Sequence, residues 1–191
     1  MSPRAIFAGL LCSCCLSQAA MAQSTAVLSA TDLPGNGRVA VNVAAGHGNQ
    51  EANVAVIAIG DHAVTPTSLI QSRGDESPAG GPVTTRIEDN TLAGSSGLIA
   101  VNVAAGNDNQ LANLAVIAIG IEAPPASTLV LDQARASQQP SGSPGSPVSS
   151  EAVAELAGTA FAGSTGLVQV NLVGGERNSS SNTFALTFAG E

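Results

Sequence analysis

The sequence predicts an all-β protein built from stacked strand–turn–strand repeats, as in a β-solenoid or a series of cross-β layers, with disordered linkers between them. The first observation is an internal repeat: GRVAVNVAAGHGNQEANVAVIAIG at 37–60 returns as GLIAVNVAAGNDNQLANLAVIAIG at 97–120, identical at 18 of 24 positions. A diverged third copy, GLVQVNLVGGERNSSSNTFALTFAG, occupies 166–190. The second observation is that β-branched residues alternate with small or polar ones inside each copy. Such repetition is typical of stacked units, of which about three are needed for stability.

Each copy is expected to form two strands around a turn. Over 39–44 valines alternate with Ala or Asn, so one face of the strand is aliphatic and the other is small or polar. The turn has the pattern Ala-Gly-x-x-Asn, in which Gly46 can take a positive φ and Asn49 tolerates one. The second strand follows Asn53. A helix over 37–60 is the alternative, but the β-branched residues, the central Gly and the two-residue alternation favour strands.

Equivalent residues form columns if the copies stack in register. Stacked Asn amides can hydrogen-bond along the columns, and the Val and Ile faces can form a dry interior. For Asn49 and Asn53 turn chemistry alone is the alternative, whereas Asn42 lies in mid-strand, where Asn is otherwise disfavoured. The expected ladders are Asn42, Asn102 and Asn171; Asn49, Asn109 and Asn178; and Asn53, Asn113 and Asn182. The expected core residues are Val41, Val101, Val170, Ile57, Ile117 and Leu186.

The ends of such a stack matter for function. Terminal layers expose unpaired N–H and C=O groups, which soluble proteins normally avoid. Because the copies within one chain match, the same contact can form between chains, and a head-to-tail contact of this kind grows without closing. The sequence therefore predicts self-assembly.

The remaining segments are of three kinds. Residues 1–22 have the pattern of a signal peptide, with Arg4, an apolar stretch over 5–16 and the small-x-small site at 20–22; a lipoprotein signal is the weaker alternative. Residues 23–36 form a lead-in. The segments 61–96 and 121–165 are linkers rich in Pro, Ser, Gly and Gln; within the second we expect disorder over 138–147 and a short helix over 150–157.

Composition excludes several classes of protein. The 191 residues include no Lys, Trp or Tyr and only four Phe, and the net charge is −8. A nucleic-acid binder needs basic and aromatic side chains, so we expect no nucleic-acid partner. No apolar run after the signal is long enough to span a bilayer, so we expect no stable membrane insertion. All three cysteines lie within 12–15, inside the predicted signal, so the processed chain would have no thiol.

Candidate catalytic and metal-binding groups are sparse. His47 and His62 are the only histidines, and no Gly-x-Ser-x-Gly elbow is present. The oxygen donors of 107–109 are compatible with calcium, but the first copy lacks them, so we expect a solvated loop there and at His47. The prediction is a protein that is not an enzyme and has neither cofactor nor metal.

The repeat motif resembles a known family. Val-Asn-Val-Ala-Ala-Gly-x-x-Asn-x-x-x-Asn at 41–53 and 101–113 is similar to Gly-Val-Asn-x-Ala-Ala-Gly-x-x-Asn-x-Gln-x-Asn, the repeat of the Fap family of bacterial functional amyloids. Three repeats and two linkers behind a signal peptide are also the layout of that family's fibre subunit and of its smaller nucleating subunit. The chain departs from the motif in having Ala at 40 and 100 and no Gln at 51, 111 or 180, and it has no C-terminal Cys-x-x-Cys.

The resemblance implies a protein of a Gram-negative bacterium, secreted through an outer-membrane channel and present in extracellular fibres or at the cell surface. It implies self-assembly, together with other amyloid subunits, into fibres of the biofilm matrix, as a minor or nucleating component. The alternative is a monomeric secreted β-solenoid that acts as an adhesin or as an accessory protein of the fibre.

Overall fold

The computed structural model describes residues 23–29, 35–61, 67–72, 81–120, 129–134 and 151–189. These residues form eleven strands and contain no helix, which confirms the predicted all-β class. The predicted signal peptide and the low-complexity stretch 138–147 lie outside the described residues. The strands are β1 (Ser24–Leu28), β2 (Asn36–Ala45), β3 (Gln50–Ile59), β4 (Thr67–Ser72), β5 (Val83–Ile87), β6 (Ser96–Ala105), β7 (Gln110–Gly120), β8 (Leu129–Ala134), β9 (Ala152–Leu156), β10 (Thr165–Gly174) and β11 (Ser179–Ala189).

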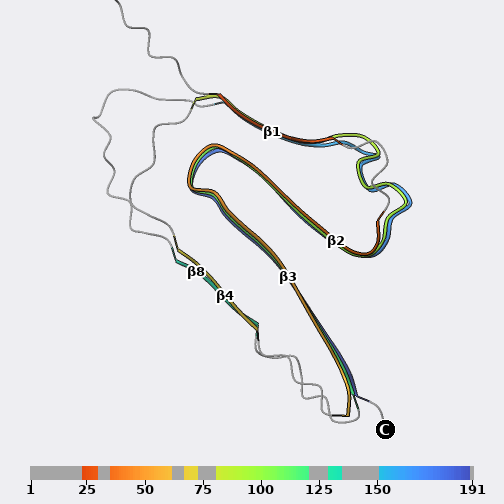
Figure 1. The fold of residues 1–191 in the computed structure, drawn as a ribbon. Coiled ribbons are helices and arrows are strands. Elements are labelled where there is room, and N and C mark those ends of the chain that lie inside the picture. Colours follow the sequence, from red (N-terminus) through yellow and green to blue (C-terminus); the bar gives the residue numbers. More distant parts are fainter. Residues whose placement is uncertain are drawn as a thin grey trace, which may run out of the picture.

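The strands pair in parallel into four sheets, ordered β1–β5–β9, β10–β6–β2, β11–β7–β3 and β4–β8. We call β1–β4 unit 1, β5–β8 unit 2 and β9–β11 unit 3. Each three-stranded sheet takes one strand from each unit, with the strand of unit 2 in the middle. The traces of the three units nearly coincide in Figure 1, where the strands of units 2 and 3 lie along those of unit 1.

Equivalent residues of the repeat are direct neighbours across the sheets. Asn42 pairs with Asn102, which pairs in turn with Asn171. The sequence separation is 60 residues between units 1 and 2 and 69 between units 2 and 3 at these positions. A slip by one residue would move every side chain to the opposite face of its sheet, so the alternating pattern specifies this register.

The apolar core lies between the β1–β5–β9 sheet and the β10–β6–β2 sheet. Ile99, Val101 and Val103 of β6 are fully buried there, in one cluster with Val83 and Ile87 of β5. Their equivalents in β2 and β10 pack against the same cluster but are only partly buried, because units 1 and 3 have a neighbouring unit on one side alone; among them are Val39, Val41, Val43, Val170 and Leu172.

A tight turn joins the two long strands of each unit, and it requires glycine at its first position. The φ angles of Gly46, Gly106 and Gly175 are 107°, 103° and 109°. A Cβ on Gly106 would lie 1.9 Å from the carbonyl oxygen of Gly175, so both the conformation and the close approach of the next unit exclude a side chain.

The expected linkers at 61–96 and 121–165 contain strands, which corrects the prediction that the repeats are joined by disordered linkers. β4, β5, β8 and β9 all lie in these segments. The helix expected over 150–157 is wrong, because Ala152–Leu156 forms β9 and pairs in register with Val83–Ile87. Ala and Glu favour helices on their own, but five residues cannot sustain an isolated helix, and pairing with β5 satisfies their backbone groups.

Candidate functional site

Two of the three predicted asparagine columns lie between the β10–β6–β2 and β11–β7–β3 sheets, one on each. Nδ2 of Asn102 donates to Oδ1 of Asn42 at 3.0 Å, and Nδ2 of Asn171 donates to Oδ1 of Asn102 at 2.9 Å. In the facing column, Nδ2 of Asn113 donates to Oδ1 of Asn53 at 2.9 Å, and Asn182 bonds to Asn113 over the same distance. Each predicted partner therefore lies beside its equivalent.

The two columns are also bonded to each other, so they form one network. Nδ2 of Asn102 lies 3.1 Å from Oδ1 of Asn53, and Nδ2 of Asn113 lies 3.0 Å from Oδ1 of Asn102. Asn113 further donates to the carbonyl oxygen of Val101 at 3.1 Å. Both Asn102 and Asn113 are fully buried, and such amides are tolerated in a protein interior only when their hydrogen-bonding groups are satisfied.

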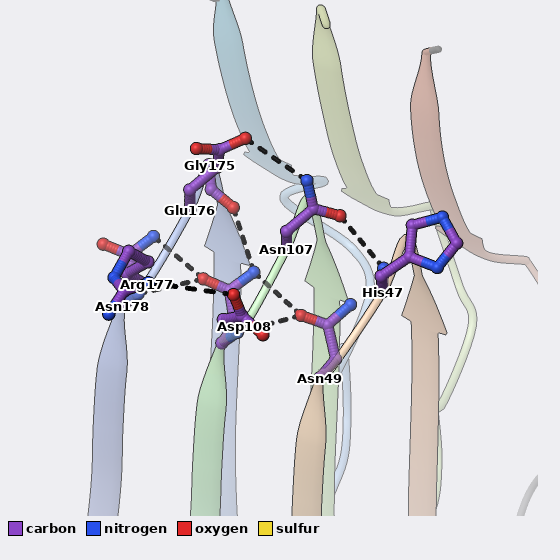
Figure 2. Close-up of polar contacts among 9 residues, drawn as sticks. His47, Asn49, Asn107, Asp108, Gly175, Glu176, Arg177 and Asn178 are labelled. Carbon is purple, nitrogen blue, oxygen red and sulfur yellow. Dashed lines mark hydrogen bonds and ion pairs between the residues drawn. The ribbon is translucent and has the colours of Figure 1, made fainter. Parts of the chain in front are cut away.

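The third column lies at the turn, and its asparagines both stabilise the turn and form a hydrogen-bonded ladder, the two roles that the sequence left open. Asn109 donates from its backbone N and from Nδ2 to Oδ1 of Asn49, both at 3.0 Å, and Asn178 repeats both contacts on Asn109 at 3.1 Å. Within its own unit, Asn49 also donates to the carbonyl oxygen of Ala45 at 3.1 Å. These asparagines therefore close the turn and link the units, and Figure 2 shows the links between units at Asn49 and Asn178.

The amide bonds between equivalent asparagines run in one direction. In every column the later unit donates through Nδ2 and the earlier unit accepts through Oδ1. Bonds from Nδ2 to backbone carbonyl oxygens, such as that of Val101, set this orientation, because a carbonyl oxygen can only accept. The stack of units therefore has two chemically different ends.

At two further positions of the turn, the three units have different residues stacked in a column. The sequence analysis missed these columns because it compared the repeats only for identical residues. In the first, the backbone N of His47 donates to Oδ1 of Asn107 at 3.0 Å, and Nδ2 of Asn107 donates to Oε1 of Glu176 at 3.3 Å (Figure 2). In the second, a guanidinium nitrogen of Arg177 lies 4.0 Å from Oδ2 of Asp108. His47 is thus part of the stacked turn and not an isolated loop residue.

The second column begins with a glycine. A Cβ on Gly48 would lie 2.1 Å from Oδ1 of Asp108, so the Asp108 carboxylate occupies the space that a side chain at position 48 would take. The φ angles of Asp108 and Arg177 are 55° and 58°, in the left-handed region that few side chains adopt. The column therefore runs glycine, acid, base through units 1, 2 and 3.

Units 1 and 3 each present an open backbone edge. In β2, the carbonyl oxygens of Gly35 and Ala45 accept from unit 2, so the odd-numbered residues face unit 2 and the even-numbered ones face outward. In β10, Thr165 and Gly175 donate to unit 2, so the even-numbered residues there face outward. The guanidinium of Arg38 covers one outward carbonyl of β3, that of Asn53, at 2.7 Å.

Part of the expected dry interior is open in the single chain. Ile57 is 58% exposed, and Ile117 and Leu186 are half-buried. Figure 1 shows that β3 diverges from β2 with distance from the turn. The far end of β3 therefore has no part of β2 beside it. The same stretch leaves Ile59, Ile119 and Phe188 exposed.

No helix among the described residues is long and apolar enough to cross a membrane. No group of three or more His, Cys, Asp or Glu side chains in the described ranges is placed to hold a metal ion.

Comparison with known proteins identifies a family but no structural match. No solved structure matches the chain. The model of the functional amyloid protein FapB/FapC family matches residues 15–189, which include all three units. That family is a structural one and not an enzyme family. The parallel, in-register pairing of the repeats and the match over nearly the whole chain lead to one conclusion: this chain belongs to the functional amyloid protein FapB/FapC family.

Proposed function

We propose that this chain is a secreted structural subunit of extracellular functional amyloid fibres in the biofilm matrix, and that its units are successive layers of a β-solenoid continued from copy to copy. The observation that carries the proposal is the difference between unit 2 and its neighbours. Val101 and Asn102 are fully buried, whereas their equivalents Val41 and Asn42 in unit 1 are not. A further copy on each open edge would bury units 1 and 3 as unit 2 is already buried.

Charge supports the same function. Along β2, β6 and β10 only Arg38 is charged, and along β3, β7 and β11 only Glu51 is charged. Identical layers place each residue over its own equivalent, where like charges repel, so nearly neutral strands favour repeated addition. The asparagine columns supply hydrogen bonds that any number of layers can continue.

The assignment as a minor or nucleating component rests on the short length of the chain, 191 residues, because the family's fibre subunit and its smaller nucleating subunit share the layout of three repeats. Export through an outer-membrane channel and co-assembly with other amyloid subunits complete the proposal, and the predicted signal peptide and the resemblance to the family support them.

Fibre diffraction tests this function directly. Purified protein diluted from denaturant, with and without preformed seeds, should form fibres with reflections near ~4.7 and ~10 Å. Seeds should shorten the lag before growth, because they supply ready edges. A protein that stays monomeric at high concentration in the presence of seeds would contradict the proposal and favour a monomeric adhesin or accessory protein.

A further inference from the structure

We propose that copies of this chain join in one orientation only, with the edge of unit 3 of one copy paired to the edge of unit 1 of the next, so that Glu176 lies beside His47 across the junction. This inference rests on the proposed function and specifies which edges join two copies in the fibre. The occupant of each open edge is a second copy of the same chain.

Backbone geometry favours this orientation. In both β2 and β10, the backbone N–H and C=O groups of the even-numbered residues point outward. Strand β10 of one copy can therefore pair with β2 of a second copy in the same hydrogen-bonding pattern in which β6 pairs with its two neighbours. Pairing of two unit 3 edges requires a twofold axis. Such an axis makes the strands of the two copies antiparallel, or it places opposite faces of their sheets side by side. In either case the core valines of one copy no longer lie beside the equivalent valines of the other.

The direction of the amide bonds gives the same answer. Asn102 and Asn171 each donate to the asparagine of the preceding unit and to a backbone carbonyl of the facing strand, at distances of 2.9–3.1 Å. Nδ2 of Asn42 has no preceding unit and makes a bond of 3.4 Å to the carbonyl oxygen of Glu51. Placed on unit 3 of another copy, Asn42 would donate to Asn171 and to the carbonyl of Ser181, as its equivalents do.

The unlike columns at the turn also distinguish the two open edges. The first column continues from Glu176 to His47 of the next copy, and the second continues from Arg177 to Gly48. The charged groups that face this His47 are Glu176 and Arg177, and Arg177 is already close to Asp108. Contact between the turns of two unit 3 edges would instead oppose Glu176 to Glu176, so like charges at the turn discriminate against it.

A disulfide test can read the orientation in fibres. In a background with Cys12, Cys14 and Cys15 changed to Ser, we would introduce His47→Cys and Glu176→Cys singly and together, grow fibres on seeds of the background protein, oxidise them and run non-reducing gels. Neighbouring strands are ~4.8 Å apart, within the range for a disulfide, whereas positions 47 and 176 of one chain are two strand spacings apart and too distant to bridge.

The double variant should give a ladder of covalent multimers, and each single variant should remain monomeric. Covalent dimers from either single variant would overturn the proposal, because they require contact between like edges. A double variant with only monomers would overturn it as well. The control pair His47→Cys with Asn107→Cys joins adjacent units of one chain, so it should form an intrachain disulfide and show that the turn permits the bond. Absence of fibres from the background protein would count against the proposed function instead.

Discussion

Glu51 of β3 lies beside Leu111 of β7, and Oε1 of this carboxyl group is buried without a hydrogen-bond partner. Burial raises the pKa of Glu51 from 4.5 to about 7, although the backbone groups of Ala104 and Val43 oppose the shift. Because the folded chain favours the protonated form, the stability contributed by this group is fully present below pH 4.5 and is lost as pH rises through about 7. The outermost strand therefore carries a group that penalises folding at neutral and alkaline pH.

The first prediction is that Glu51→Gln stabilises the chain at alkaline pH and has little effect in acid. One pKa unit corresponds to about 1.4 kcal/mol, and partial solvent exposure reduces the full effect, so we expect a gain of roughly 1–2 kcal/mol near pH 8. Urea unfolding near pH 5 and near pH 8 measures it. The exposed Glu151→Gln serves as control, and an equal response of the two variants to pH would contradict the role of Glu51.

The second prediction concerns the buried amide network. Asn113→Ala should lower the free energy of unfolding by about 2–4 kcal/mol, because it removes bonds to Asn53, Asn102 and Val101 in a site closed to water. Its equivalent at the open edge, Asn182→Ala, should cost less in the single chain and should slow seeded growth. Denaturant titration and fibre elongation report the two effects. Equal destabilisation by both variants would contradict this prediction, because it would mean that each asparagine stabilises only its own unit and not the contact between units.

The third prediction is that Gly106→Ala prevents correct folding of the turn. The new Cβ would meet the carbonyl oxygen of Gly175, and φ is 103°. We expect a loss of at least about 2 kcal/mol, seen as a lower midpoint of thermal unfolding. Gly60→Ala is the matched control, because nothing lies within 4 Å of its Cβ position. A Gly106→Ala variant that melts with the wild type would show that the turn relaxes more easily than its geometry indicates.

The sequence predicted the parts of this fold that repeat. Identity between copies and the alternation over 39–44 were enough to place β2, β6 and β10 and to predict which asparagines are neighbours. The short strands β5 and β9 were not predicted because they share little sequence: Val83–Ile87 and Ala152–Leu156 are alike in alternation alone, and their pairing becomes visible only in the structure. The pair Asn107 and Glu176 was missed for a related reason, since unlike residues in one column become visible only when the register is known.

The last prediction separates folding from growth within one sheet. The N–H of Val101 faces unit 3 inside the chain, because Ser95 and Ala105 on the same side of β6 accept hydrogen bonds from β10. Val101→Pro should therefore disrupt the chain itself as well as abolish fibres. The N–H of Ala40 faces outward, so Ala40→Pro should leave the far-ultraviolet circular dichroism spectrum close to that of the wild type and should still stop growth at the unit 1 edge. Ala40→Ser, which keeps the N–H, should elongate normally. Normal elongation of the Ala40→Pro protein on wild-type seeds would mean that β2 does not form the junction, and the edge-to-edge contact between copies would then have to be assigned to other strands.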